Sequence, residues 1–128
     1  MANEITTSTY RIWLGADGIV RLDPHGDREQ RLAEAKENTE AIGRLVQGGR
    51  APMLIYGRTI KGVDREAREY YRSKDGTRHA SAIGVLVTSV VGKVIANFIT
   101  SLVSSGTAPV RLFNDEEEAL GWLRSFLP

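Results

Sequence analysis

Cysteine is absent from this sequence of 128 residues. Its absence excludes disulfide bonds, thiolate zinc sites and cysteine nucleophiles. It also fits a reducing compartment, so we expect a cytoplasmic protein. An excess of one charge is missing too, because 17 Lys and Arg residues balance 16 Asp and Glu residues. Domains that bind nucleic acid usually carry a basic excess, and we therefore expect no nucleic-acid partner.

Long apolar runs are missing as well. The most apolar stretch, residues 82–103, is interrupted by Gly84, Lys93 and Asn97 and is too polar for a membrane span. The first nine residues lack the apolar core of a secretory signal. The remaining composition is that of an ordinary globular domain, and the length suits one domain. We therefore predict a single domain over residues 1–128, with residues 1–8 as a flexible N-terminal extension.

A β-hairpin is predicted near the N-terminus. Two segments, residues 10–14 and 19–22, have apolar residues at every second position, as half-buried strands do. These residues are Tyr10, Ile12 and Leu14 in the first segment, and Val20 and Leu22 in the second. Between the two segments stands Asp17-Gly18, a dipeptide that favours tight hairpin turns.

Helices and buried strands alternate along the rest of the chain. Capping-box spacing between Asp27 and Gln30 predicts a helix over residues 27–47. Asp64 is placed to cap a shorter second helix, and Asn114 with Glu117 to cap the last one. The predicted strands are residues 53–56, 82–87 and 110–113, and the predicted later helices are residues 64–72, 90–104 and the C-terminal segment.

The predicted element order is β-β-α-β-α-β-α-β-α. Apolar strands separated by helices pair in parallel, and the first hairpin adds an antiparallel edge. We therefore expect an α/β fold with a five-stranded mixed sheet.

This order resembles the STAS domain of anti-anti-sigma factors. It is most similar to the STAS-like family of small bacterial proteins related to the sporulation anti-anti-sigma factor. The resemblance covers residues 10–127. The segments that carry it are Tyr10–Leu14, Met53–Tyr71, Pro109–Phe113 and Ala119–Leu123.

The phosphoacceptor signature of STAS regulators, Asp-Ser-Ser/Thr-Gly, is absent from the matching segment. Asp64 stands at the acidic position, but Arg65 and Glu66 replace the serine and glycine positions. The resemblance therefore does not extend to a phosphoserine switch. The family's recognition region maps to this part of the chain, and we expect Arg58, Lys61, Asp64 and Arg65 to line a partner-facing surface. An ordinary solvated loop remains the alternative.

A second candidate surface lies on the predicted helix over residues 90–104. Gly92, Ala96 and Thr100 recur at four-residue spacing, and small residues allow close helix approach. The hypothesis is a self-association face or a lipid-facing groove with Lys93 and Asn97 at its rim. Packing within the molecule is the alternative.

Catalytic and metal-binding patterns are missing from the sequence. His25 and His79 are isolated, and no His/Asp/Glu ligand cluster or G-x-S-x-G elbow is present. We therefore expect no metal, no cofactor and no catalytic residues. The acidic run Asp115–Glu118 is better explained by helix capping and the helix dipole than by a cation site.

Three functions remain open from the sequence. The leading interpretation is a non-enzymatic regulatory module that binds a protein partner or a second copy of itself. The alternative is a carrier or sensor of a small apolar ligand or lipid, because the STAS-like fold has been related to lipid-binding domains of the CRAL-TRIO type. An enzyme is the weakest candidate, because no base is paired with a nucleophile.

Overall fold

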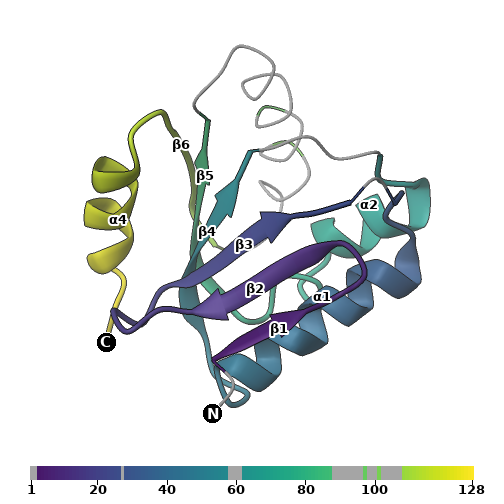
Figure 1. The fold of residues 1–128 in the computed structure, drawn as a ribbon, viewed down its shortest axis with the longest axis horizontal. Coiled ribbons are helices and arrows are strands. Elements are labelled where there is room, and N and C mark those ends of the chain that lie inside the picture. The colour runs from purple at the N-terminus through teal and green to yellow at the C-terminus, as the bar shows by residue number, and fades with distance from the viewer. Residues whose placement is uncertain (1–2, 27, 58–61, 88–96, 98–100, 102–107) are drawn as a thin grey trace.

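The structure is a computed structural model (Figure 1). It describes residues 3–26, 28–57, 62–87, 97, 101 and 108–128. Among these residues, no helix is long and apolar enough to cross a membrane.

One mixed sheet of six strands forms the centre of the fold, in the order β1-β2-β3-β4-β5-β6. The first two pairings are antiparallel and the last three are parallel. The strands are β1 Glu4–Thr6, β2 Tyr10–Leu14, β3 Val20–Pro24, β4 Ala51–Tyr56, β5 Ala80–Leu86 and β6 Val110–Phe113. The predicted α/β class with a mixed sheet and an antiparallel N-terminal edge is confirmed.

The predicted number of five strands is wrong. Residues 4–6 form β1, which pairs with β2 through Ile5 opposite Ile12, so a flexible extension does not describe them. The side chains of Glu4 and Thr6 are exposed. This short strand carries little apolar signal of its own, and its pairing depends on the neighbouring edge of β2.

The predicted β2–β3 hairpin is confirmed. Ile12 lies opposite Leu22 in the register, so the apolar positions of both strands share one face. Gly18 adopts a positive φ of 84°, which glycine tolerates and most residues do not. Its N–H donates to the Gly15 carbonyl at 3.0 Å, closing the turn.

The first helix, α1 Leu32–Leu45, is shorter than predicted. The N-cap residue of this helix is Arg31. The Glu34 carboxylate accepts a hydrogen bond from the Arg31 backbone N–H at 2.8 Å. Asp27 lies outside the described residues. Gln30 instead forms an isolated parallel bridge with Val63, which holds it in extended backbone before the helix.

The later helices begin where capping side chains stand. Asp64 caps α2 Arg65–Arg72 by accepting from the Ala67 N–H at 2.9 Å, as predicted. The last helix, α4 Glu116–Arg124, is capped by Asp115 rather than by Asn114. Most of the predicted helix over residues 90–104 lies outside the described residues, although Asn97 and Ser101 are helical.

Two apolar cores lie on opposite faces of the sheet. Figure 1 shows α1 and α2 on one side and α4 on the other. The α4 core is built around Ile19, Leu54, Ala82, Phe113, Leu120 and Leu123. The larger core, under α1 and α2, contains Ile12, Val20, Met53, Ile83 and Val85, and it contains the candidate site described next.

Candidate functional site

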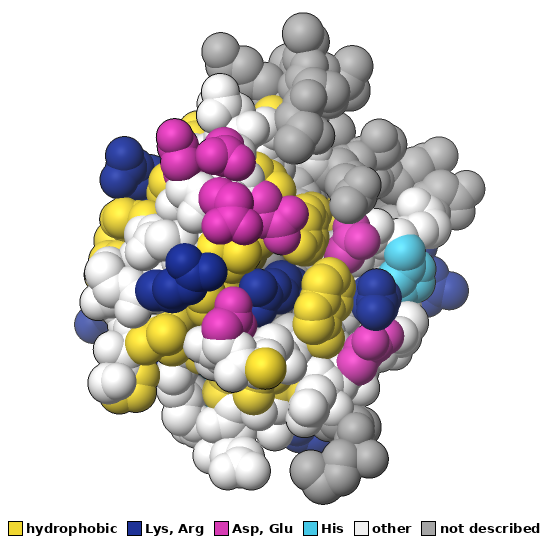
Figure 2. All heavy atoms as spheres, turned by 60° about the vertical axis from the view of Figure 1, so that its left-hand side comes forward, with side chains coloured by type: hydrophobic (Ala, Val, Ile, Leu, Met, Phe, Trp, Pro, Cys, Tyr) yellow, Lys and Arg dark blue, Asp and Glu magenta, His cyan; other side chains and the backbone are white. Residues whose placement is uncertain are grey.

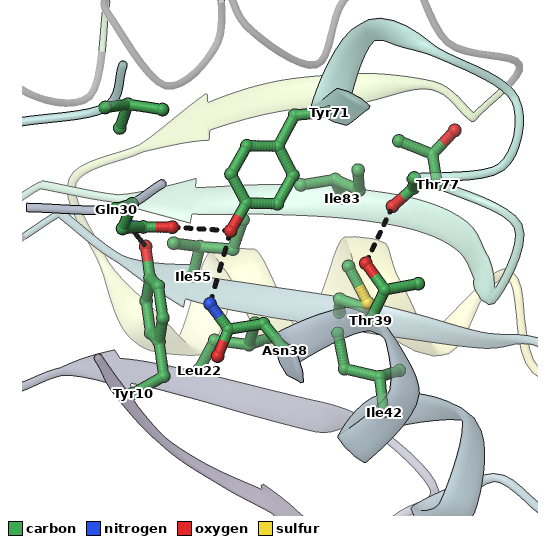
Figure 3. Close-up of a pocket in the computed structure, with 13 residues that line it drawn as sticks. Tyr10, Leu22, Gln30, Asn38, Thr39, Ile42, Ile55, Tyr71, Thr77 and Ile83 are labelled. Atoms are coloured by element: carbon green, nitrogen blue, oxygen red, sulfur yellow. Dashed lines mark hydrogen bonds between the residues drawn. The ribbon is translucent and has the colours of Figure 1, made fainter. Parts of the chain in front are cut away.

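A cavity of about 60 Å³ lies between the sheet and the helices α1 and α2 (Figure 3). Eleven of its 13 lining residues are buried. Tyr71 and Gly76 are the two that are partly exposed. The lining residues are Tyr10, Leu22, Gln30, Asn38, Thr39, Ile42, Met53, Ile55, Val63, Tyr71, Gly76, Thr77 and Ile83.

Strand residues supply the apolar floor of this cavity. Leu22, Ile55 and Ile83 come from the neighbouring strands β3, β4 and β5. They share a face because alternate residues of a strand point to the same side. Ile42 of α1 and Val63 complete the apolar wall.

A chain of hydrogen bonds forms the polar end of the cavity. Tyr71 of α2 donates its hydroxyl proton to the Gln30 side-chain oxygen at 2.5 Å. The Gln30 amide nitrogen donates to the Tyr10 hydroxyl at 3.4 Å. Figure 3 shows these three side chains pointing toward one another.

Asn38 of α1 anchors this chain to the N-terminal strands. Its amide nitrogen donates to the Tyr71 hydroxyl at 3.2 Å and to the Thr9 hydroxyl at 3.0 Å. Its carbonyl oxygen accepts from the Thr7 hydroxyl at 2.5 Å. Asn38, Thr7 and Thr9 are each at most 5% exposed. A buried amide is stable only when it is hydrogen-bonded, and Asn38 meets that condition while tying α1 to the β1–β2 connection.

The two tyrosine hydroxyls of the cavity stay neutral. Burial raises the pKa of Tyr10 above that of an exposed tyrosine. Burial is also the largest cause that raises the pKa of Tyr71. Both side chains therefore remain hydrogen-bond donors throughout the physiological pH range.

The other end of the cavity is shaped by a glycine. The Thr39 hydroxyl donates to the carbonyl oxygens of Ala35 at 3.1 Å and Gly76 at 3.4 Å. A Cβ atom at Gly76 would collide with the Tyr70 carbonyl oxygen. Glycine at this position lets the α2–β5 connection lie close against α2, which brings Thr77 into the wall.

A second surface of interest lies on the opposite face of the sheet, over β1–β3. No described helix covers this part, since α4 packs on β4, β5 and β6. Trp13 stacks on Tyr56 with ring centroids 6.1 Å apart, and the Arg11 guanidinium lies 4.6 Å from the Trp13 ring. Figure 2, which brings the α4 side forward, shows basic and acidic side chains interleaved with hydrophobic ones.

Ion pairs hold the arginines of this open sheet face. Arg11 pairs with Glu4 at 2.8 Å, and both side chains are exposed. Arg21 pairs with Asp17 at 2.6 Å, and its hydrogen bond is the main cause that lowers the pKa of the Asp17 carboxyl. The Tyr56 hydroxyl donates to Glu116 at 3.0 Å.

Of the site residues predicted from the sequence, the structure describes Asp64, Arg65 and Asn97, and none of these three lines the pocket. Asp64 caps α2, and Arg65 is exposed beside Glu69 at 3.2 Å. Asn97 is exposed. The other predicted residues lie outside the described residues; they are Arg58, Lys61, Gly92, Lys93, Ala96 and Thr100. Among the described side chains, no group of three or more His, Asp or Glu is arranged to hold a metal ion.

Residues 12–127 match the model of a family described as a domain of unknown function, DUF7793. The chain belongs to this family. No curated protein matches it.

Two solved structures are similar to the chain. One is an uncharacterised protein of the DUF3478 family from Shewanella loihica PV-4, with a SpoIIAA-like fold. It is 14% identical, with a TM-score of 0.57, over 96% of this chain and 98% of that one. The other is a protein of unknown function from Arthrobacter sp. FB24, which is 30% identical, with a TM-score of 0.33, over 88% of this chain and 96% of that one. The first match shows that this chain has a SpoIIAA-like, that is STAS-like, fold.

The cavity was not predicted from the sequence. A signal was present, because the polar pair Asn38-Thr39 interrupts the apolar stripe of α1 between Ala35 and Ile42. A polar pair on the buried face of a helix indicates a buried hydrogen-bond network. The Tyr71 hydroxyl lies in that network.

Proposed function

We propose that this chain is a non-enzymatic binding module whose cavity under α1 and α2 holds a small organic molecule. The observation that carries the proposal is the cavity itself. It combines an apolar floor with a cluster of hydrogen-bonding groups at one end, as small-molecule sites commonly do. The sequence leaves two ligand types open, a small molecule and a lipid. The cavity volume of only about 60 Å³ favours a small molecule over an extended lipid.

The chemistry of the lining supports binding without catalysis. The 13 lining residues include no carboxylate, imidazole, amine or thiol. General acid–base catalysis near neutral pH needs a group that titrates there, and the pKa values of Tyr10 and Tyr71 are raised instead. The amides of Gln30 and Asn38 position a ligand but transfer no proton.

Native mass spectrometry tests this function directly. Protein purified under mild conditions should carry a small molecule, or take one up from a library of small uncharged compounds. Val63→Phe fills the cavity from its wall and should abolish that occupancy, while Val85→Phe in the same core reports the effect of overpacking alone. Circular dichroism checks that each variant is folded. Wild-type protein that is empty and takes up no compound would contradict the proposal.

A second function, self-association, is favoured by the open sheet face. Trp, Tyr and Arg are the residue types enriched at protein interfaces, and Trp13, Tyr56, Arg11 and Arg21 gather there. This face carries side chains of both charges, paired as Arg11 with Glu4 and Arg21 with Asp17. A mixed-sign face can complement its own copy across a two-fold axis, so the occupant we assign is a second copy of this chain.

Sedimentation velocity with a matched pair of charge reversals tests this second function. Arg11→Glu alters the open sheet face, and Arg65→Glu alters the surface predicted from the family resemblance. Each arginine is exposed and pairs with a glutamate, and exposed ion pairs contribute little folding stability. Because the Arg11 guanidinium also lies over the Trp13 ring, circular dichroism checks that each variant is folded. A dimer lost only in Arg11→Glu supports the open face. A monomeric wild type, or a dimer lost only in Arg65→Glu, refutes it.

A further inference from the structure

The polar end of the cavity offers hydrogen-bond donors to a ligand. Gln30 is 3% exposed and Tyr10 is 7% exposed, so water does not reach them freely. Both side chains line the cavity, and Figure 3 shows the Tyr10 hydroxyl directed toward the Gln30 side chain.

Two protons of this cluster are left over when the hydrogen bonds are counted. Tyr71 gives its only hydroxyl proton to Gln30, and Asn38 gives its two amide protons to Thr9 and Tyr71. Gln30 gives one of its two amide protons to Tyr10. Within the described part of the chain, the second Gln30 proton and the Tyr10 hydroxyl proton have no acceptor. An unsatisfied buried donor costs about 1–3 kcal/mol, which a ligand oxygen would recover.

The described residues of the cavity wall carry no charge. None of the 13 lining side chains is Lys, Arg, His, Asp or Glu. An ionised ligand would therefore lose its hydration without gaining a counter-charge, which costs several kcal/mol. The acceptor that these donors fit is an uncharged oxygen.

Size limits the ligand further. An engineered protein cavity of about 150 Å³ accommodates benzene, and this one measures about 60 Å³. The occupant is therefore smaller than a benzene ring. Beyond the donors, the cavity is lined by Leu22, Ile55 and Ile83, which fit a short alkyl group.

We propose that the cavity selects a small uncharged carbonyl compound, such as a short ketone, aldehyde or ester, whose oxygen accepts from Tyr10 and Gln30. This ligand class rests on the proposed small-molecule function and makes it specific. It predicts discrimination between molecules of one shape that differ only in the group meeting the two donors.

Three probes of nearly equal shape test the ligand class. Butan-2-one carries the neutral oxygen, 2-methylbut-1-ene replaces that oxygen by a methylene group, and propanoate replaces a methyl group by a charged oxygen. Their dissociation constants follow from titration of the methyl NMR signals of Ile42, Val63 and Ile83 at pH 7. Propanoate should bind at least about a hundredfold more weakly than butan-2-one, because its buried charge is unpaired.

Tyr10→Phe separates hydrogen bonding from hydrophobic affinity. It removes one hydroxyl group and should weaken butan-2-one about fivefold to tenfold, as loss of one hydrogen bond does. Affinity for 2-methylbut-1-ene should not fall. Gln30→Met, which removes the other donor, should give the same pattern. Comparing the two probes across the variants cancels the difference in their hydration.

The outcomes distinguish this inference from the proposed function. If 2-methylbut-1-ene and butan-2-one bind with no dependence on Tyr10 or Gln30, the small-molecule function stands and the carbonyl class is wrong. Propanoate binding as tightly as butan-2-one also overturns the carbonyl class. If wild-type protein binds none of the three probes and takes up no library compound, both proposals fail.

Discussion

Replacing Asn38 by alanine should destabilise the fold more than any exposed polar substitution. Asn38 is 2% exposed and makes three side-chain hydrogen bonds, to the hydroxyls of Thr7, Thr9 and Tyr71. Alanine removes all three bonds, although the Tyr71 hydroxyl keeps its bond to Gln30 and the Thr7 hydroxyl keeps its bond to the Tyr10 carbonyl oxygen. At about 1 kcal/mol for each bond, the expected loss of unfolding free energy is about 3 kcal/mol.

Urea unfolding followed by circular dichroism measures this loss. With a urea m-value of about 2 kcal/mol/M for a domain of this size, the midpoint should fall by about 1.5 M. The control is Asn97→Ala, because Asn97 is also helical but exposed; its effect should stay within about 0.5 kcal/mol. A loss of less than about 1 kcal/mol for Asn38→Ala would refute the role of Asn38 as the anchor of the network.

Further substitutions test the cavity, the glycine and the tyrosine of the site. Val63→Ile should leave the free energy of unfolding unchanged or raise it, because the added methyl group enters the cavity. Val85→Ile in the same packed core should lower the free energy of unfolding by about 1–3 kcal/mol. Equal losses in the two variants would argue against the cavity. In thermal unfolding, Gly76→Ala should lower the midpoint because its Cβ collides with backbone, and Gly121→Ala, which meets nothing within 4 Å, should raise it; a harmless Gly76→Ala would contradict the close approach. Burial raises the pKa of Tyr71, so the folded state keeps a proton that the unfolded chain loses above about pH 10. Stability should therefore fall as the pH rises above about 10. The fall should be less steep in Tyr71→Phe, and identical slopes for the two proteins would contradict this burial.

Local patterns in the sequence predicted most of the fold. The turn at Asp17-Gly18, the cap at Asp64 and the apolar strands 53–56 and 110–113 each depend on a few neighbouring residues, and each was predicted correctly. The strand β1 was missed because its three residues pair only through the edge of β2. The start of α1 was misplaced because Gln30 is held by a bridge to Val63, a contact 33 positions away.

The pocket was harder to predict than the fold for the same reason. Asn38 is 31 positions from Thr7 and 33 from Tyr71, and only the packing of α1 and α2 on the sheet brings these groups together. The interrupted apolar stripe of α1 indicates that something polar is buried there. It does not indicate which partners are present, nor that their packing leaves a space.

The proposal that the cavity under α1 and α2 is a binding site is tested most directly by methyl NMR under xenon pressure. Xenon enters small apolar cavities without needing a hydrogen bond, so it reports on the space independently of ligand chemistry. The account predicts shifts for the methyl groups of Ile42, Val63 and Ile83, and no shifts for Ile19 and Leu54, which pack under α4 on the opposite face of the sheet. Unshifted signals from the three cavity residues, or equal shifts on both faces, would contradict it.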